Sequence, residues 1–236
     1  MRPYRDIAEM QQFYNRPLGA WVVRRLSPII ADIWPMCEKF TMAAGGYPLP
    51  FLTTPIPVIM AATQGALPWP SDAPNCVAVS EDGLIPFATG SLQRLLLVHA
   101  LENTAYAPYF LQECWRVLAP EGQLLVVVPS RVGTWARSDK TPFGHGQPYS
   151  AKQLRQALQA VQFVPQRLTR ALYAPPLIAK YAPWLALGLE RVGAHLAPKL
   201  GGVLICVAAK QLYAVRPTTG GSPVVANWLD AATNPL

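Results

Sequence analysis

The side chains best suited to chemistry in this 236-residue sequence gather in two places. In the first, His99 follows the apolar run 95–98, and Glu102 stands three residues later. Histidine titrates near neutral pH and can act as a general base, with a neighbouring carboxylate fixing its tautomer. A structural alternative fits the same residues, with His99 hydrogen-bonded at a strand end and Glu102 capping the next helix. His99 is therefore a candidate catalytic residue with two interpretations.

The second place is the segment 131–149, where basic and aromatic residues alternate with glycines. The segment follows an apolar run that predicts a parallel strand, and ligands of open α/β sheets bind at the carboxyl ends of such strands. His145 is a second candidate base, and the segment supplies candidate substrate-binding residues: Arg131, Trp135, Arg137, His145 and Tyr149. Alternatively the segment packs over the sheet and its cations face water.

Apolar runs on either side of these residues predict the elements that position them. Continuous runs at 93–99 and 123–129 are typical of strands buried on both faces of a parallel sheet. Between them, residues 108–118 carry apolar side chains at helical spacing. Because a strand, a crossover helix and a parallel strand form a right-handed unit, the pattern predicts a layered α/β domain.

Three motifs occur in order within residues 84–130: I-P-F-x-x-x-S, then L-L-L-V-H-A-L-E, then L-x-E-x-W-R-V-L-x-P-x-G-x-L-L-V-V-V-P. They resemble the second half of the core of class I S-adenosylmethionine-dependent methyltransferases of the small-molecule, type 11-like group. With the helix 150–161 and the strand after it, the resemblance covers roughly half of the chain. It implies a three-layer, Rossmann-like sheet of about seven mostly parallel strands with helices on both faces, and S-adenosylmethionine as cofactor.

The glycine-rich cofactor motif of that family is degenerate in this sequence. The family has an acid followed by G-x-G-x-G, whereas here Met42 replaces the acid and Ala44 and Pro48 replace two glycines, leaving Gly46 in register. The strand at 57–62 also ends without the usual acid. The resemblance implies cofactor contacts at Ala44, Gly45, Gly46, Tyr47, Met60 and His99, with Glu81 or Asp82 reaching the adenine amino group. A solvated turn explains Glu81 and Asp82 equally well.

Length and patterning predict one domain over 1–214, with helices over 1–36, a helical insert over 175–200 and a flexible tail over 215–236. Asn15 is expected to cap the second helix, with Pro17 in its first turn. Four isolated cysteines, Cys37, Cys76, Cys114 and Cys206, indicate free thiols and a cytoplasmic protein, and no metal site is expected. The net charge of +7 favours an anionic partner or simply a basic surface.

Two functions follow from these observations. The first is transfer of a methyl group from S-adenosylmethionine to an unidentified small-molecule or macromolecular acceptor. The alternative is a catalytically inactive protein of the same fold that binds a ligand or a protein partner, the latter through the insert 175–200. The intact later motifs favour the first, and the degenerate glycine motif favours the second. Membrane association of the insert is a third, less favoured hypothesis, and the sequence carries no strong signal for nucleic acid or membrane.

Overall fold

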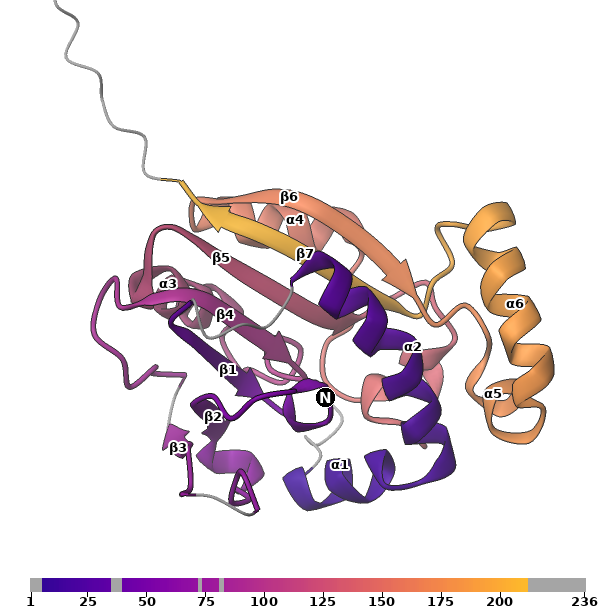
Figure 1. Cartoon of the computed structure of the whole chain (residues 1–236). Coiled ribbons are helices and arrows are strands. Elements are labelled where there is room, and N and C mark those ends of the chain that lie inside the picture. The colour runs from indigo at the N-terminus through magenta and orange to yellow at the C-terminus, as the bar shows by residue number, and fades with distance from the viewer. Residues whose placement is uncertain (1–5, 35–39, 72–73, 81–82, 212–236) are drawn as a thin grey trace, which may run out of the picture.

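The computed structural model describes residues 6–34, 40–71, 74–80 and 83–211. Within these residues seven strands form one sheet in the order β3-β2-β1-β4-β5-β7-β6, as Figure 1 shows. Neighbouring strands are parallel except at β7, which runs antiparallel to both β5 and β6. The strands are β1 (Met42–Gly46), β2 (Val58–Ala61), β3 (Val77–Ser80), β4 (Leu92–Val98), β5 (Leu118–Pro129), β6 (Phe163–Ala171) and β7 (Val203–Lys210). The prediction of about seven mostly parallel strands is confirmed.

The helices cover both faces of the sheet, as the sequence predicted. One face carries α3 (Ala107–Val117) and α4 (Ala151–Ala160), and the other carries α1 (Ile7–Tyr14) and α2 (Pro17–Ile33). The insert forms α5 (Pro176–Tyr181) and α6 (Pro183–Leu196), which lie beyond the ends of β6 and β7 in Figure 1. Four short 3-10 turns complete the described elements: η1 (Leu49–Phe51), η2 (Ala62–Gln64), η3 (Trp135–Arg137) and η4 (Pro142–Gly144).

Central strands have apolar side chains on both faces because both faces are covered. Along β4, Leu95 and Leu97 pack with α3 and α4, whereas Leu96 and Val98 pack with α1 and α2. Side chains of a strand point alternately to opposite faces, so a continuous apolar run fills two cores at once. This confirms the interpretation of the runs at 93–99 and 123–129 as buried parallel strands.

Element ends agree with the sequence where a local signal sets them. Ser150 and Gln153 form a reciprocal cap of α4: the Ser150 hydroxyl accepts from the Gln153 amide at 3.2 Å, and the Gln153 side chain accepts from the Ser150 amide at 3.0 Å. The expectation for Asn15 is wrong, because Asn15 keeps helical dihedrals (φ −78°, ψ −9°) and ends α1. Arg16 precedes α2 instead, with no side-chain cap, and Pro17 is its first residue. Cys37 and the tail 215–236 lie outside the described residues.

None of the helices in the described part of the chain has the length and apolar character needed to cross a membrane.

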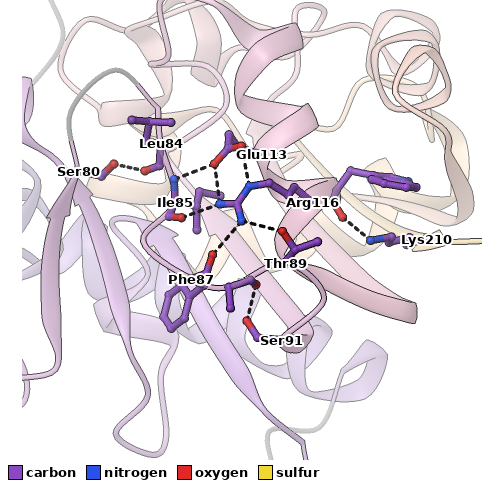
Figure 2. Close-up of polar contacts among 11 residues, drawn as sticks. Ser80, Leu84, Ile85, Phe87, Thr89, Ser91, Glu113, Arg116 and Lys210 are labelled. Carbon is purple, nitrogen blue, oxygen red and sulfur yellow. Dashed lines mark hydrogen bonds and ion pairs between the residues drawn. The ribbon is translucent and has the colours of Figure 1, made fainter.

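Strand β7 ends in a buried lysine that closes the carboxyl end of α3. The Lys210 ammonium donates to the carbonyl oxygens of Trp115 at 2.7 Å and Leu118 at 2.6 Å, and it lies 3.9 Å from the centre of the Trp115 ring. Lys210 is labelled in Figure 2. The last carbonyls of a helix lack intrahelical donors, and a cation there also complements the helix dipole. Lys210 is 4% exposed, and this burial lowers its pKa. The lysine therefore joins the last strand of the chain to the central crossover helix.

Replacing Lys210 with methionine keeps the apolar stem and removes the donor. We expect Lys210→Met to lower the free energy of unfolding by about 2 kcal/mol, because two buried carbonyls lose a charged hydrogen-bond partner. Urea denaturation measures this change. The exposed lysine of α4 provides the control, Lys152→Met, which should shift stability by less than about 0.5 kcal/mol. Equal effects of the two substitutions would contradict the assigned role of Lys210.

Candidate functional site

A cavity of about 310 Å³ opens at the carboxyl ends of β1, β2, β3 and β4. This is the edge at which open parallel sheets bind ligands. The cavity is lined by residues from the strand ends and the connections after them: Gly45, Gly46, Ile59, Ala61, Thr63, Gln64, Ser80, Gly83, Leu84, Ile85, Leu97, Ala100, Asn103, Thr104, Ala105, Tyr106 and Phe110. No charged side chain occurs among these described lining residues.

The turn after β1 requires glycine at position 46. Gly46 has φ +81°, and a Cβ atom there would lie 2.2 Å from the carbonyl oxygen of Val98. The Tyr47 amide then donates to the same carbonyl at 2.7 Å, which holds the turn against the end of β4. Glycine is the residue that adopts this left-handed conformation without a steric penalty. Gly46 therefore allows β1 to end directly beside β4 at the cavity.

Strand alternation separates the residues expected to contact a cofactor. Gly45 and Gly46 line the cavity, whereas Ala44 and Met60 are fully buried in the cluster on the opposite side of the sheet. Tyr47 is also buried there and stacks on Tyr14, with ring centroids 5.6 Å apart. On β2 the cavity is lined instead by the two neighbours of Met60, Ile59 and Ala61. Glu81 and Asp82 lie outside the described residues.

His99 lies beside the cavity, in a buried network of three polar side chains. It is fully buried, adopts φ +53°, and has its Nδ1 atom 3.0 Å from Glu102 Oε1 and its Nε2 atom 2.8 Å from the Tyr14 hydroxyl. Burial, followed by the nearby charge of Glu102 and by Tyr47, raises the pKa of Tyr14 well above its usual value, so the phenol stays protonated. The phenol can then donate to Nε2 while Nδ1–H donates to Glu102. Both ring nitrogens of His99 are occupied by protein partners.

The segment 131–149 folds over the rim and packs into the core. Trp135 is fully buried, donates to the carbonyl oxygen of Ala174 at 2.8 Å and stacks parallel to Trp21 at 6.1 Å. His145 Nε2 lies 3.1 Å from the carbonyl oxygen of Asp139.

The other candidate substrate residues of this segment are less deeply buried than Trp135. Arg131 and Arg137 are exposed, and Arg131 donates to the carbonyl oxygen of Pro148 at 3.3 Å. Burial raises the pKa of the half-buried Tyr149 to about 12. The structure thus brings Arg131, Trp135, Arg137, His145 and Tyr149 to the same rim as the cavity, and none of them lines it.

Two buried carboxamides in the cavity wall were missed by the sequence analysis. Asn103 Nδ2 donates to the carbonyl oxygen of His99 at 2.9 Å, which fixes the amide orientation and leaves Oδ1 without a partner among the described residues. Gln64 is 5% exposed, and its Nε2 atom likewise has no partner there. Gln64 stands three residues after the end of β2, near the position where the family has a carboxylate. A polar side chain of any kind at that strand end is the sequence signal that indicates Gln64.

Arg116 holds in place the connection between β3 and β4, which forms one wall of the cavity, and Figure 2 shows the contacts of its guanidinium. Its guanidinium donates to the carbonyl oxygens of Ile85 and Phe87, each at 2.9 Å, and pairs with both oxygens of Glu113 at 2.8 Å. The second Glu113 oxygen also accepts from the Ile85 amide at 3.3 Å. Nearer β3, the Ser80 hydroxyl donates to the carbonyl oxygen of Leu84. The connection between β3 and β4, which supplies Gly83, Leu84 and Ile85 to the cavity, is thereby fastened to α3.

Comparison with solved structures identifies the class of fold. A methyltransferase from Thermotoga maritima, described as S-adenosylmethionine-dependent and a possible histamine N-methyltransferase, matches with a TM-score of 0.56 at 13% identity, over 87% of this chain and 96% of its own. An S-adenosylmethionine-dependent methyltransferase from Aquifex aeolicus matches with a TM-score of 0.53 at 11% identity, over 87% and 98%. No family model and no curated protein matches the sequence.

A third solved structure with the same fold is that of an enzyme named for a different reaction. The [4+2]-cyclase SpnF matches with a TM-score of 0.51 at 16% identity, over 80% of this chain and 82% of its own. The chain therefore has the fold of class I S-adenosylmethionine-dependent methyltransferases. At these identities the likeness defines the fold alone, because function depends on the site that a fold carries.

The Tyr14 hydroxyl offers a first test of the buried network. Tyr14→Phe leaves the ring in place and leaves His99 Nε2 without its partner, so we expect a loss of about 1 to 3 kcal/mol in the free energy of unfolding. Chemical denaturation measures it, with Tyr106→Phe as the control, because Tyr106 is 68% exposed. Unchanged stability of Tyr14→Phe would show that the hydrogen bond to His99 does not contribute.

The ion pair of Arg116 and Glu113 predicts a pH dependence of stability. The hydrogen bonds from Arg116 lower the pKa of Glu113 below its usual value of 4.5. A lowered folded-state pKa contributes stability that is fully present above the usual value and is lost as the pH falls through the folded-state pKa. The stability advantage of the wild type over Glu113→Gln should therefore shrink as the pH falls below about 4.5. Urea denaturation across this range measures the advantage, and a constant difference would exclude the ion pair as its source.

Proposed function

We propose that the protein binds S-adenosylmethionine in the cavity at the β1 to β4 edge and transfers its methyl group to an acceptor that is not identified. The observation that carries the proposal is the position of the cavity, beside the Gly45–Gly46 turn at the carboxyl ends of four parallel strands. The class I methyltransferase fold and the motifs of residues 84–130 support it.

The residues present fit a nucleoside cofactor in size and polarity. A cavity of about 310 Å³ falls at the lower end of the range for small-molecule sites, which are mostly apolar with a few polar groups. Ile59, Leu97 and Phe110 would contact the apolar face of a base. Gln64 Nε2 and Asn103 Oδ1 are enclosed and lack protein partners within the described residues, and each side chain would have to turn toward the cavity to offer its donor or acceptor to a ligand. Uncharged amides would thus take hydrogen bonds that carboxylates supply in the family.

The chemistry asks little of the protein beyond positioning. S-adenosylmethionine supplies an electrophilic methyl group on a sulfonium, and transfer requires the acceptor to be held close and in line with it. The apolar cavity wall keeps water away from the reacting groups. Within this proposal His99 is a positioning residue, because Tyr14 and Glu102 engage both of its ring nitrogens. The network fixes the end of β4, from which Ala100 and Asn103 reach the cavity.

Acceptor contacts from the rim remain part of the proposal. Arg131, Trp135, Arg137 and Tyr149 stay predictions, and so does His145 as a base. The rim segment is connected to the cavity wall, since the Gln147 amide donates to the carbonyl oxygen of Glu102 at 2.8 Å. An acceptor that reaches the methyl group from this side would contact the segment.

A second candidate function is ligand or partner binding without catalysis. It is favoured by the cavity itself, whose described lining has no carboxylate to hold ribose hydroxyls. A protein of this kind would retain the fold and use the cavity, or the insert 175–200, for recognition alone.

We also propose a reducing, cytoplasmic compartment. Cys76, Cys114 and Cys206 are free, and burial raises the pKa of the Cys206 thiol to about 11, which keeps it in the unreactive protonated form.

Titration calorimetry with S-adenosylmethionine tests the proposal. We expect the wild type to bind, and a concentration 100 times the dissociation constant to raise the free energy of unfolding by about 2.7 kcal/mol. Gln64→Met should weaken binding about fivefold, through loss of one hydrogen bond, without lowering stability. Gln112→Met, on the exposed face of α3, is the matched control and should bind as the wild type does. Absence of binding to the wild type would overturn the cofactor assignment, and binding without methyl transfer from labelled cofactor would favour the second function.

A further inference from the structure

Exposed apolar side chains are concentrated on the helical insert. Of fourteen large apolar or aromatic residues that are exposed in the described part of the chain, eight lie between residues 177 and 200. Tyr181 is 72%, Trp184 76% and Leu196 81% exposed. Isolated exposed apolar residues are ordinary on soluble proteins, whereas a continuous patch indicates an interaction surface.

The exposed apolar side chains of α6 lie outside the side of the helix that packs against the rest of the protein. The helix packs against the rest of the protein through Ala186 and Glu190, and through Gly193, whose Cβ position would lie 2.6 Å from Tyr173. At 100° per residue, Trp184 and Val192 fall on the opposite side of the helix from this packed side. Leu177 and Tyr181 of α5 are four residues apart and also face outward. We call these exposed residues of 177–200 the insert surface, and Figure 1 shows its two helices at the edge of the molecule.

The charges on and around the insert surface are positive. Residues 175–200 contain one acid, Glu190, which is 7% exposed and accepts from the Ala174 amide at 3.0 Å. Lys180, Arg191 and Lys199 are exposed. The surface thus has accessible cations and no accessible carboxylate of its own.

A basic cleft adjoins this surface. The cleft has a volume of about 270 Å³ and lies between α2, the end of β6 and α6. Its lining includes Arg25, Arg170, Arg191 and His195, and the one acid among its described lining residues is the buried Glu190. Arginine side chains recognise phosphate through paired N–H groups. The cleft is therefore suited to phosphate groups that approach from the side of the insert.

We propose that the insert surface docks on an anionic lipid bilayer. Helix α6 has 14 residues, fewer than the roughly 20 of a membrane span, so it would lie in the plane of the interface. Leu177, Val192 and Leu196 would enter the boundary between headgroups and acyl chains, and Tyr181 and Trp184 suit that boundary because they combine an apolar ring with a polar atom. The lysines and the arginine cleft would meet the lipid phosphates. The accessible cations would repel the same surface of a second copy, which makes self-association less favourable. The proposal goes beyond methyl transfer and does not depend on it.

Vesicle flotation of the full chain tests the proposal. The wild type should float with vesicles of phosphatidylcholine mixed with phosphatidylglycerol, less with phosphatidylcholine alone, and less at high salt. The double variant Trp184→Ser, Leu196→Ser should bind at least about tenfold more weakly, because it removes two of the most exposed apolar groups. Lys180→Gln and Lys199→Gln should each weaken binding to the anionic vesicles about fivefold and leave binding to phosphatidylcholine vesicles unchanged. Val79→Ser is the control, since Val79 is 54% exposed on edge strand β3 at the other end of the sheet order, and it should not alter binding.

Three outcomes would overturn the proposal. In the first, the wild type does not float with the anionic vesicles, and a protein partner is then the better candidate for the surface. Another is equal binding by the wild type and the Trp184→Ser, Leu196→Ser variant, with circular dichroism confirming that both are folded. A third is a wild-type protein that sediments as a dimer and does not bind vesicles, together with a double variant that sediments as a monomer. This result would assign the surface to a second copy of the chain.

Discussion

The Arg116 guanidinium is the contact on which the described cavity wall depends. The connection between β3 and β4 has irregular backbone near Ile85 and Phe87, and its carbonyls need donors as any buried backbone group does. A planar guanidinium can serve two carbonyls and a carboxylate at once, which an ammonium cannot do in the same geometry. Because Arg116 stands on α3, it ties the wall to the helix that also packs on the sheet, and Lys210 fastens the end of that helix to β7. In the sequence segment E-x-W-R, the glutamate is Glu113 and the arginine is Arg116, and both residues make these contacts.

The polar residues His99 and Glu102 at the rim are buried and hydrogen-bonded to protein partners. His99 and Glu102 have the spacing of a base and its orienting carboxylate, yet both are fully buried and His99 is bonded on both sides. The network instead joins α1, through Tyr14, to the end of β4. Both ring nitrogens of His99 are satisfied in this buried set, whereas Glu102 Oε2 has no hydrogen-bond partner among the described residues. The same bonds give the rim beside the cavity a fixed shape.

The cavity and the insert surface lie in separate parts of the molecule and would bind their ligands through different interactions. In the cavity, two amides without protein partners lie among apolar side chains, which suits an uncharged polar ligand. On the insert, apolar side chains are exposed among cations, which suits an anionic interface. The fold by itself requires neither, since a cyclase and methyltransferases share it.

The sequence by itself determined the two central strands and the helix between them, because apolar runs and helical spacing are local signals, and the resemblance of residues 84–130 to a known family implied the mostly parallel sheet. It did not determine which side chains face the cavity. That depends on the pairing of β1 with β2 and β4, which directs Gly45 and Ile59 toward the cavity and Ala44 and Met60 away from it. The sequence also did not determine whether the apolar helices at 175–200 are buried or exposed, because the same apolar composition fits both cases. Only the tertiary structure decided these points, because facing and exposure are set by contacts between segments that are distant along the chain.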